Sequence, residues 1–268
     1  DEATIANLTT DYMEEKSLRK KYWNMMEDMK GKIRVYARCR PMAKYEIEKD
    51  CRPVVKFIDD ASMEVEGPRG IKEFTFDGVF SPSGSQAEIY EDTKHLIASA
   101  IDGYNVCLFA YGQTGSGKTW TMTGGRSEES SGITPRAMRQ LFSDANELNS
   151  RGTSQITMST YFVELYNDKV VDLYWALDHK KDRKSEPPKL EIKVDAKKMV
   201  VIKNAVIKEA GSVEEITKLF DKGNAMRHVG ATKMNAESSR SHSIFSILIS
   251  NKDLITNKTS VGKLTLVD

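Results

Sequence analysis

The sequence predicts an α/β fold in three layers, with a central, mostly parallel β-sheet flanked by helices. Two observations lead to this prediction. Stretches with the alternating pattern of strands are separated along the chain by stretches with the helical spacing of apolar residues. A nearly continuous apolar run, 105–111, is followed at once by a glycine-rich turn and another helical stretch. That order is typical of a parallel strand, buried on both faces, that leads into a helix.

Composition excludes several classes of protein. The 268 residues contain 40 Lys and Arg against 39 Asp and Glu, a net charge of +1, so we expect no nucleic-acid partner. The three cysteines form no C-x-x-C pair, which argues against a disulfide framework or zinc site and favours a cytosolic setting. No apolar run approaches the roughly 20 residues that span a bilayer, so we expect no membrane partner. Without a signal-peptide pattern at its start, the chain reads as a soluble segment of a longer protein.

The first 30 or so residues predict a helix, because they contain no Pro or Gly and their apolar residues recur every three or four positions. Gly31 is expected to end this helix. The stripe that begins at Ile5 is out of register with the one that begins at Leu18, so a continuous heptad repeat is not secure. Two interpretations stay open: a helix packed on its own domain, and a coiled coil that joins two chains.

The period changes to two over 33–40, which predicts a strand that ends at Pro41. Short strands are expected at 54–58, 62–65 and 73–76. Ser85 and Glu88 form a capping-box pattern that opens a helix over 85–101, with Ile89, Leu96, Ile97 and Ile101 on its apolar side.

In the second half, Pro135 predicts the first position of a helix that runs through residue 142. Ser212 and Glu215 form another capping-box pattern, before a helix that carries Ile216, Leu219 and Phe220. Strands are expected at 156–166, 190–194, 200–207, 243–249 and 263–267, the last of which ends in Asp268.

The segment 112–119, GQTGSGKT, fits the phosphate-loop pattern G-x-x-x-x-G-K-S/T. Its glycines allow backbone conformations that other residues avoid, and they let amide N–H groups approach phosphate oxygens. Lys118 offers a compact charge to the β- and γ-phosphates, and Thr119 offers a hydroxyl to Mg²⁺. A turn without a ligand fits the flanking strand and helix less well, so the motif predicts a P-loop NTPase fold. The expected nucleotide-binding residues of the loop are Gly112, Gln113, Thr114, Gly115, Ser116, Gly117, Lys118 and Thr119.

A second polar cluster, 235–242, has the sequence NAESSRSH and lies between a predicted helix and a predicted strand. By itself such a run of hydroxyls is compatible with ordinary capping and turn chemistry. Together with the phosphate loop, it resembles the N-x-x-S-S-R-S-H switch I of the kinesin motor domain. Leu266-Val267-Asp268 looks like the start of the L-V-D-L-A-G-S-E switch II, and 38–41 fits R-x-R-P. The segment 164–168, followed by Asp172 and Leu173, fits a further segment of the family.

The resemblance covers about 32–268 and implies a motor domain there, which stops at the first residue of switch II. Residues 1–31 resemble the neck helix of minus-end-directed, C-terminal-motor kinesins, most closely those of the plant calmodulin-binding type. Gly31-Lys32 stands where relatives often carry Gly-Asn, which weakens the inference about direction. Most of the family's tubulin-binding surface, and the helix that would bind calmodulin or a related calcium sensor, would lie beyond Asp268.

The resemblance also implies roles for single residues around ATP or ADP and Mg²⁺. Thr119 and Ser239 would ligate the metal, and Asp268 would reach it through water. The expected catalytic residues are Lys118, Ser238, Ser239, Arg240 and Asp268. Ser238 would sense the γ-phosphate, and Arg240 would pair with a switch II glutamate beyond Asp268.

For the adenine base, the resemblance implies a pocket lined by Arg38, Arg40 and Pro41, with the Trp120 ring stacked on the base. A tryptophan buried in the core is the alternative for Trp120.

At the level of function, the resemblance implies an ATP-driven, minus-end-directed microtubule motor, a microtubule-stimulated ATPase of the cytoplasm and its microtubule cytoskeleton. A dimer would form through the neck helix. Segment 180–203 carries nine basic and four acidic residues, which could steer the chain toward an acidic filament or simply form a solvated loop. Two alternatives stay open: a phosphate-loop ATPase with other targets, and a module that binds ATP without hydrolysing it in this truncated form.

Overall fold

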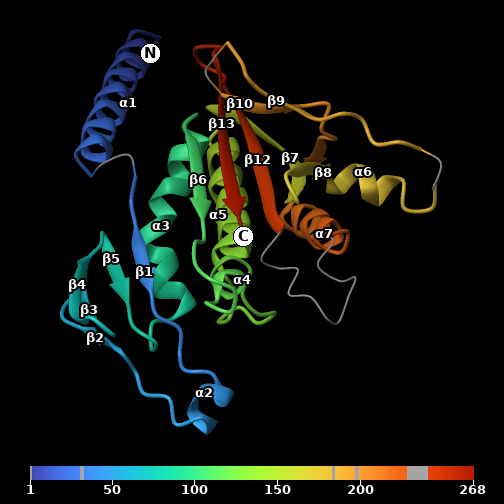
Figure 1. Cartoon of the computed structure of the whole chain (residues 1–268). Helices are drawn as coiled ribbons and strands as arrows, with labels where there is room; N and C mark the ends of the chain where they lie inside the picture. Colours follow the sequence, from blue (N-terminus) through green and yellow to red (C-terminus); the bar gives the residue numbers. More distant parts are fainter. Residues whose placement is uncertain (1, 31–32, 183–184, 197–198, 228–240) are drawn as a thin grey trace. The chain divides into compact units, whose positions relative to one another are not determined.

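The computed structural model describes residues 2–30, 33–182, 185–196, 199–227 and 241–268 (Figure 1). The chain divides into two compact units, Asp1–Ser83 and Gly84–Asp268. This division differs from the predicted boundary between a neck at 1–31 and a motor domain at 32–268, which stays a prediction. Among the described helices, none combines the length and the apolar composition needed to cross a bilayer.

The first unit consists of a long helix and two small sheets. Strands β1 and β5 pair in parallel, and β2, β3 and β4 form an antiparallel sheet. Its elements are α1 (Glu2–Lys30), β1 (Tyr36–Arg38), α2 (Lys44–Glu48), β2 (Val55–Phe57), β3 (Ser62–Gly67), β4 (Gly70–Thr75) and β5 (Gly78–Phe80). The strand predicted over 33–40 is shorter than expected, because β5 offers partners only to residues from Tyr36 to Arg38.

Helix α1 confirms the helix predicted for the start of the chain. Both of its apolar stripes are exposed: Ile5, Leu8 and Tyr22 each keep 64% of their surface accessible. Both interpretations of this helix, a helix packed on its own domain and a coiled coil, stay open.

The second unit is built on a six-stranded sheet in the order β11-β7-β12-β13-β6, with β8 paired to β7. Its strands are β6 (Asn105–Phe109), β7 (Ser154–Tyr166), β8 (Lys169–Asp172), β11 (Lys208–Ala210), β12 (Ser241–Asp253) and β13 (Thr259–Val267), and β9 (Glu191–Val194) and β10 (Val200–Lys203) form a separate hairpin. Its helices are α3 (Gln86–Ile101), α4 (Lys118–Met122), α5 (Ile133–Ser150), α6 (Leu173–Asp178) and α7 (Val213–Asn224).

The α/β class is confirmed, but the prediction of a mostly parallel sheet is wrong. Only β13 and β6 pair in parallel, whereas β7, β8, β11, β12 and β13 are joined by antiparallel pairing. The antiparallel pairing of β12 with β13 has a local cause. Strands β12 and β13 are joined by only a few residues, and a short connection can join antiparallel neighbours but not parallel ones.

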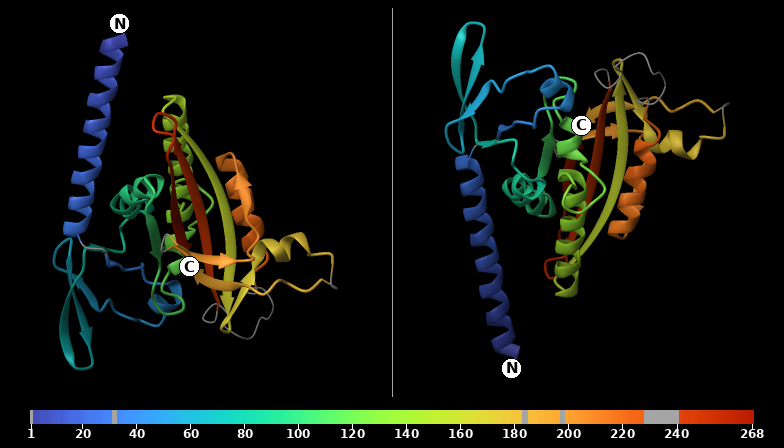
Figure 2. Two further views of the ribbon diagram at one scale, coloured as in Figure 1. Left: turned by 90° about the horizontal axis from the view of Figure 1, so that it is seen from above. Right: turned by 90° about the horizontal axis from the view of Figure 1, so that it is seen from below.

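One face of this sheet carries the core. Phe162 of β7 lies parallel to Phe220 of α7 at 5.5 Å and edge-on to Phe245 of β12 at 5.2 Å. Gly262 of β13 lies against α3, and Asn149 of α5 bonds the main chain of Ile156. By strand register, Phe162, Ile156 and Gly262 share one face, so α3, α5 and α7 cover that same face. Figure 1 and Figure 2 show β12 and β13 side by side, with α5 alongside them.

The opposite face of the sheet meets the β9–β10 hairpin. Lys263 of β13 points away from the core face, and its Nζ donates to the carbonyl of Val200 at 2.6 Å. Burial lowers the pKa of Lys263. The β9–β10 hairpin therefore lies on the face of the sheet opposite α3, α5 and α7.

Strand β6 departs from its prediction as well. It lies at the end of the sheet and pairs only with β13 among the described strands, and Asn105, Cys107 and Phe109 are exposed. The prediction of burial on both faces is therefore wrong for the described residues, because an apolar run does not distinguish an edge strand from a central one.

The helix starts are mostly as predicted. The capping box of α3 is complete, with Ser85 Oγ accepting from the Glu88 N–H and the Glu88 carboxylate accepting from the Ser85 N–H. For α7, Ser212 accepts from Glu215 N–H as expected, but the Glu215 carboxylate accepts from Gly211 instead. Helix α5 begins at Ile133, so Pro135 is its third residue and not its first, still within the turn where no N–H is needed.

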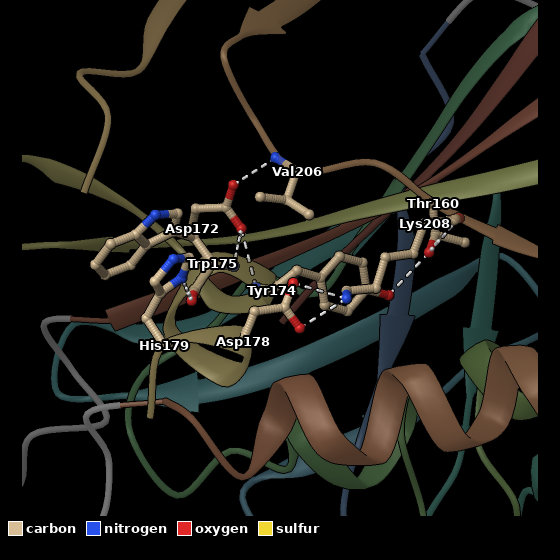
Figure 3. Close-up of polar contacts among 8 residues, drawn as sticks. All are labelled: Thr160, Asp172, Tyr174, Trp175, Asp178, His179, Val206 and Lys208. Carbon is tan, nitrogen blue, oxygen red and sulfur yellow. Dashed lines mark hydrogen bonds and ion pairs between the residues drawn. The ribbon is translucent and has the colours of Figure 1, made fainter. Parts of the chain in front are cut away.

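A buried carboxylate holds the region that precedes β11 (Figure 3). Asp172 accepts from the N–H groups of Tyr174 and Trp175, which caps α6, and its other oxygen accepts from Val206 N–H at 2.6 Å. Lys208 of β11 pairs with Asp178 at the end of α6 at 2.8 Å. The long segment between α6 and β11 is thus fixed at both of its ends.

The packing of Gly262 predicts that Gly262→Ala lowers the free energy of unfolding by about 2 kcal/mol. A Cβ at this position would lie 1.9 Å from the carbonyl oxygen of Ala100, so the main chain of α3 would have to move. Urea denaturation measures the effect. Gly67→Ala is the control, since its Cβ would have no neighbour closer than 3.8 Å. Equal unfolding midpoints for the two variants would contradict this account of the sheet–helix contact.

Candidate functional site

The phosphate-loop motif has the predicted surroundings, with β6 ending at Phe109 and α4 beginning at Lys118. Gly115 and Gly117 have φ angles of 81° and 96°, in the left-handed region that favours glycine. Gly117 is also the residue that caps the start of α4. The pattern of glycines therefore matches a backbone that other residues would adopt only with strain.

The Lys118 ammonium is folded back over its own loop. Its Nζ donates to the carbonyl oxygens of Gly112 at 2.9 Å and Gln113 at 3.0 Å. These acceptors are neutral, and a phosphate oxygen is a stronger acceptor for an ammonium group. The side chain is thus held inside the turn and could exchange these bonds for a bound anion.

Thr119 and Asp268 meet across 149 residues of sequence. Thr119 Oγ1 donates to Asp268 Oδ1 at 3.1 Å. The contact follows from the sheet, because β6 and β13 are parallel neighbours in which Val267 lies opposite Phe109. The carboxyl ends of both strands therefore reach the same edge, the usual place for a ligand in an α/β sheet.

The Thr119 hydroxyl and the Asp268 carboxylate fit a site for Mg²⁺. Hydroxyl and carboxylate oxygens are the donors that this hard cation prefers, and it usually keeps several waters and phosphate ligands besides. Within the described ranges there is no cluster of three His, Cys, Asp or Glu that could bind a metal by itself. Thr119 and Asp268 would thus hold Mg²⁺ together with a nucleotide.

Two residues that the sequence analysis did not assign to the site complete it. Arg227, just after α7, lies between two carboxylates, with Nη1 3.8 Å from Asp268 Oδ2 and Nε 3.8 Å from Glu164 Oε1. The Glu164 side chain is fully buried and also accepts a hydrogen bond from Ser241 Oγ. A nearby cation lowers the cost of burying a carboxylate, and Arg227 contributes one. Glu164 interrupts an apolar strand pattern and could have been noticed, whereas Arg227 carries no local signal.

Trp120, in α4, is 50% exposed. The alternative of a core tryptophan is therefore wrong, and the indole ring is accessible to a ligand. Its stacking on an adenine base stays a prediction.

The remaining predicted site residues stay predictions. Ser238, Ser239 and Arg240 lie outside the described residues. Arg38, Arg40 and Pro41 belong to the first unit, and their place in an adenine pocket stays a prediction.

Within that first unit, Arg40 has a local partner. It bonds both carboxylate oxygens of Glu46, at 2.6 and 2.8 Å. The hydrogen bonds from Arg40, and a further one from Ala43 N–H, lower the pKa of Glu46 to about 2.

Two features of the site define its class. A glycine-rich phosphate loop lies between a strand and a helix, and its threonine contacts the aspartate that follows the neighbouring parallel strand. Together they define a P-loop nucleotide-binding fold. The family model "Kinesin motor domain" matches residues 38–268. The chain therefore belongs to the kinesin motor domain family.

Relatives agree with this assignment. The chain is 44% identical to the kinesin-like protein KIN-14E of Arabidopsis thaliana and 42% identical to KIN-14I of Oryza sativa, each over 99% of its length. It spans about a fifth of these relatives, 20% and 21%. The solved structure of a fast kinesin, described with its ATPase mechanism and microtubule interactions, matches with a TM-score of 0.77 and 35% identity. That match covers 88% of this chain and 64% of the solved one.

The charge cluster predicts that Arg227→Met lowers the free energy of unfolding by about 3 kcal/mol, because the positive charge between Asp268 and buried Glu164 is removed. In a double-mutant cycle with Glu164→Gln, the two effects should fall short of additivity by at least about 0.5 kcal/mol. Arg151→Met is the control, since Arg151 pairs with Glu147 on the surface and should cost less than about 0.5 kcal/mol. Equal costs for the two arginines, measured by urea denaturation, would contradict the cluster.

Proposed function

We propose that this chain binds ATP with Mg²⁺ in the loop 112–119 and hydrolyses it as part of a motor that moves on microtubules. The contact between Thr119 and Asp268 carries this proposal. It joins the hydroxyl that follows the phosphate-loop lysine to the first residue of the expected switch II. The fast kinesin of matching fold, described with its ATPase mechanism and its interactions with microtubules, supports the same function.

In this proposal, each group of the loop has a separate task. Lys118 exchanges its carbonyl partners for the β- and γ-phosphates, and the amides of 115–119 hold the same oxygens. When bound, Mg²⁺ neutralises part of the charge that develops during phosphoryl transfer. Thr119 and Ser239 would ligate the metal, and Asp268 would hold it through water. The Arg227 guanidinium lies 3.8 Å from the second oxygen of Asp268 and attracts it, which favours this orientation of the carboxylate.

The switch residues would respond to the terminal phosphate. Ser238 detects it, and Arg240 pairs with the glutamate expected beyond Asp268. Ser241, which follows directly, is bonded to buried Glu164, so the segment 235–242 is anchored at its C-terminal end. A switch segment of this kind orders around the terminal phosphate and is released after hydrolysis.

The finer assignments also belong to this proposal. The resemblance of residues 1–31 to the neck of minus-end-directed kinesins supports minus-end-directed movement with α1 as the neck. Calmodulin or a related calcium sensor would bind beyond Asp268, and the motor would work in the cytoplasm on microtubules. Segment 180–203, which includes the β9–β10 hairpin, would meet the acidic filament with its excess of basic residues.

Lys118→Ala should reduce ATP hydrolysis about a hundredfold or more, with and without microtubules, because the charge on the phosphates is lost. Steady-state phosphate release in the protein that contains this chain measures it. Lys94→Ala is the control, since Lys94 pairs with Glu91 on the surface of α3. Normal turnover in Lys118→Ala would refute the site.

The same assay separates the alternatives. A wild-type rate that rises with microtubules supports the motor, and a rate indifferent to them supports an ATPase with another target. Nucleotide binding without turnover supports a binding module.

At low salt, replacing Lys197 and Lys198 (both outside the described residues) by Ala should weaken microtubule affinity, whereas the same change at exposed Lys218 and Lys222 should not.

Helix α1 should associate with a second copy through its exposed stripes, so Ile5→Glu with Leu8→Glu should shift the protein from dimer to monomer. Sedimentation velocity measures the change. Glu15→Gln, at an exposed polar position of the same helix, should leave the dimer intact. A monomeric wild type would contradict a dimer formed through the neck.

A further inference from the structure

The helix that carries Lys118 and Thr119 is unusually short. Helix α4 stops at Met122, and α5 begins only at Ile133. In the break between these two helices, the N–H groups of Thr123 and Gly124 both donate to the carbonyl of Thr119. The next N–H, of Gly125, donates to the carbonyl of Ser130. The carbonyl of Trp120 thus depends on a donor from elsewhere.

Gln86 provides that donor. Its Nε2 donates to the carbonyl of Trp120 at 2.7 Å and to the carbonyl of Ser130 at 3.1 Å. Both N–H groups of the amide are therefore used by main-chain carbonyls on the two sides of the break. Gln86 is 5% exposed, so water does not readily replace these bonds.

The position of Gln86 is itself fixed. It is the first residue of α3, and the capping box formed by Ser85 and Glu88 holds the preceding turn. Helix α3 is buried along its core face through Ile89, Ile97 and Ile101. The amide is thus attached to one of the best-packed helices of the second unit, all within Gly84–Asp268.

The loop 123–132 is also held together by contacts that do not involve Gln86. Gly132 N–H donates to the carbonyl of Thr123, and Gly124 bridges Ser131. Arg136 donates to the carbonyls of Glu128, Glu129 and Ser131. The Trp120 ring lies against this loop, since a Cβ at Gly125 would be 3.6 Å from its Cζ3.

We propose that Gln86 is a positioning residue for nucleotide binding. Its buried amide holds the end of α4 and the loop 123–132 on α3, and thereby fixes Lys118, Thr119 and Trp120 at the phosphate loop. This inference rests on the proposed function and adds a residue that acts on the nucleotide only through α4. Loss of the amide leaves the carbonyl of Trp120 without its donor and lets α4 shift, so a bound nucleotide should dissociate faster.

The test is the dissociation of a fluorescent ADP analogue, mant-ADP with Mg²⁺, from the full chain after mixing with excess ATP. Gln86→Ala should raise the dissociation rate about tenfold, the factor that corresponds to one ordinary hydrogen bond. The association rate should change less than twofold, because the groups that contact the phosphates are all retained. Gln86→Glu keeps the shape of the side chain, but its carboxylate cannot donate to the carbonyls, so it should behave like Gln86→Ala.

Gln140→Ala is the matched control. Gln140 also links α3 to α5, by accepting from the Tyr90 hydroxyl at 2.5 Å, but it does not contact the break. It should leave the dissociation rate within twofold of wild type, even where its unfolding midpoint in urea falls as far as that of Gln86→Ala. This difference separates positioning from a general loss of stability.

The outcomes are distinct. Dissociation from both Gln86 variants at the wild-type rate, or an equal acceleration in Gln140→Ala, would overturn the inference and leave the proposed function standing. A wild-type chain that binds no mant-ADP would overturn the proposed function and this inference with it. Acceleration in the two Gln86 variants alone supports the inference.

Discussion

The parallel pairing of β6 with β13 is the constraint on which the site depends. The loop 112–119 follows β6, and Asp268 follows β13, so both come to the same edge of the sheet. The other pairs in this sheet are antiparallel, and an antiparallel neighbour would have delivered its carboxyl end to the opposite edge. The contact between Thr119 and Asp268 is therefore a consequence of strand direction, not of any local sequence signal.

A cluster of buried polar and charged side chains lies at the same edge of the sheet, next to Asp268. Glu164 comes from β7, Ser241 from β12 and Arg227 from the residues after α7, and all converge near Asp268. The two oxygens of Asp268 face different partners, a hydroxyl on one side and a guanidinium on the other. A carboxylate held in this way has its direction set by the protein and not by solvent. A substitution of Asp268 would thus alter the contacts of Arg227 and, through Glu164, those at the start of β12.

Sequence reasoning succeeded where the determinant is local. The capping box at Ser85 and the spacing of the phosphate-loop glycines both involve residues within one turn of each other, and both are found as predicted. It failed where burial depends on distant partners, as at the edge strand β6. Arg227 and Gln86 were missed for the same reason. Their partners lie 34 or more residues away, and nothing in the neighbouring residues distinguishes them.

The manner in which α4 is held has a mechanical consequence. Five residues are too few for a stable helix by themselves, and within α4 only Met122 is buried. Its position is thus set largely by polar contacts: the loop carbonyls and Asp268 bind Lys118 and Thr119, and Gln86 binds the carbonyl of Trp120. Such contacts are directional and individually weak, whereas α3 and α5 are anchored by apolar burial. The element that carries the phosphate-binding side chains is therefore the one that a ligand can move at the least cost in free energy, while the sheet behind it stays fixed.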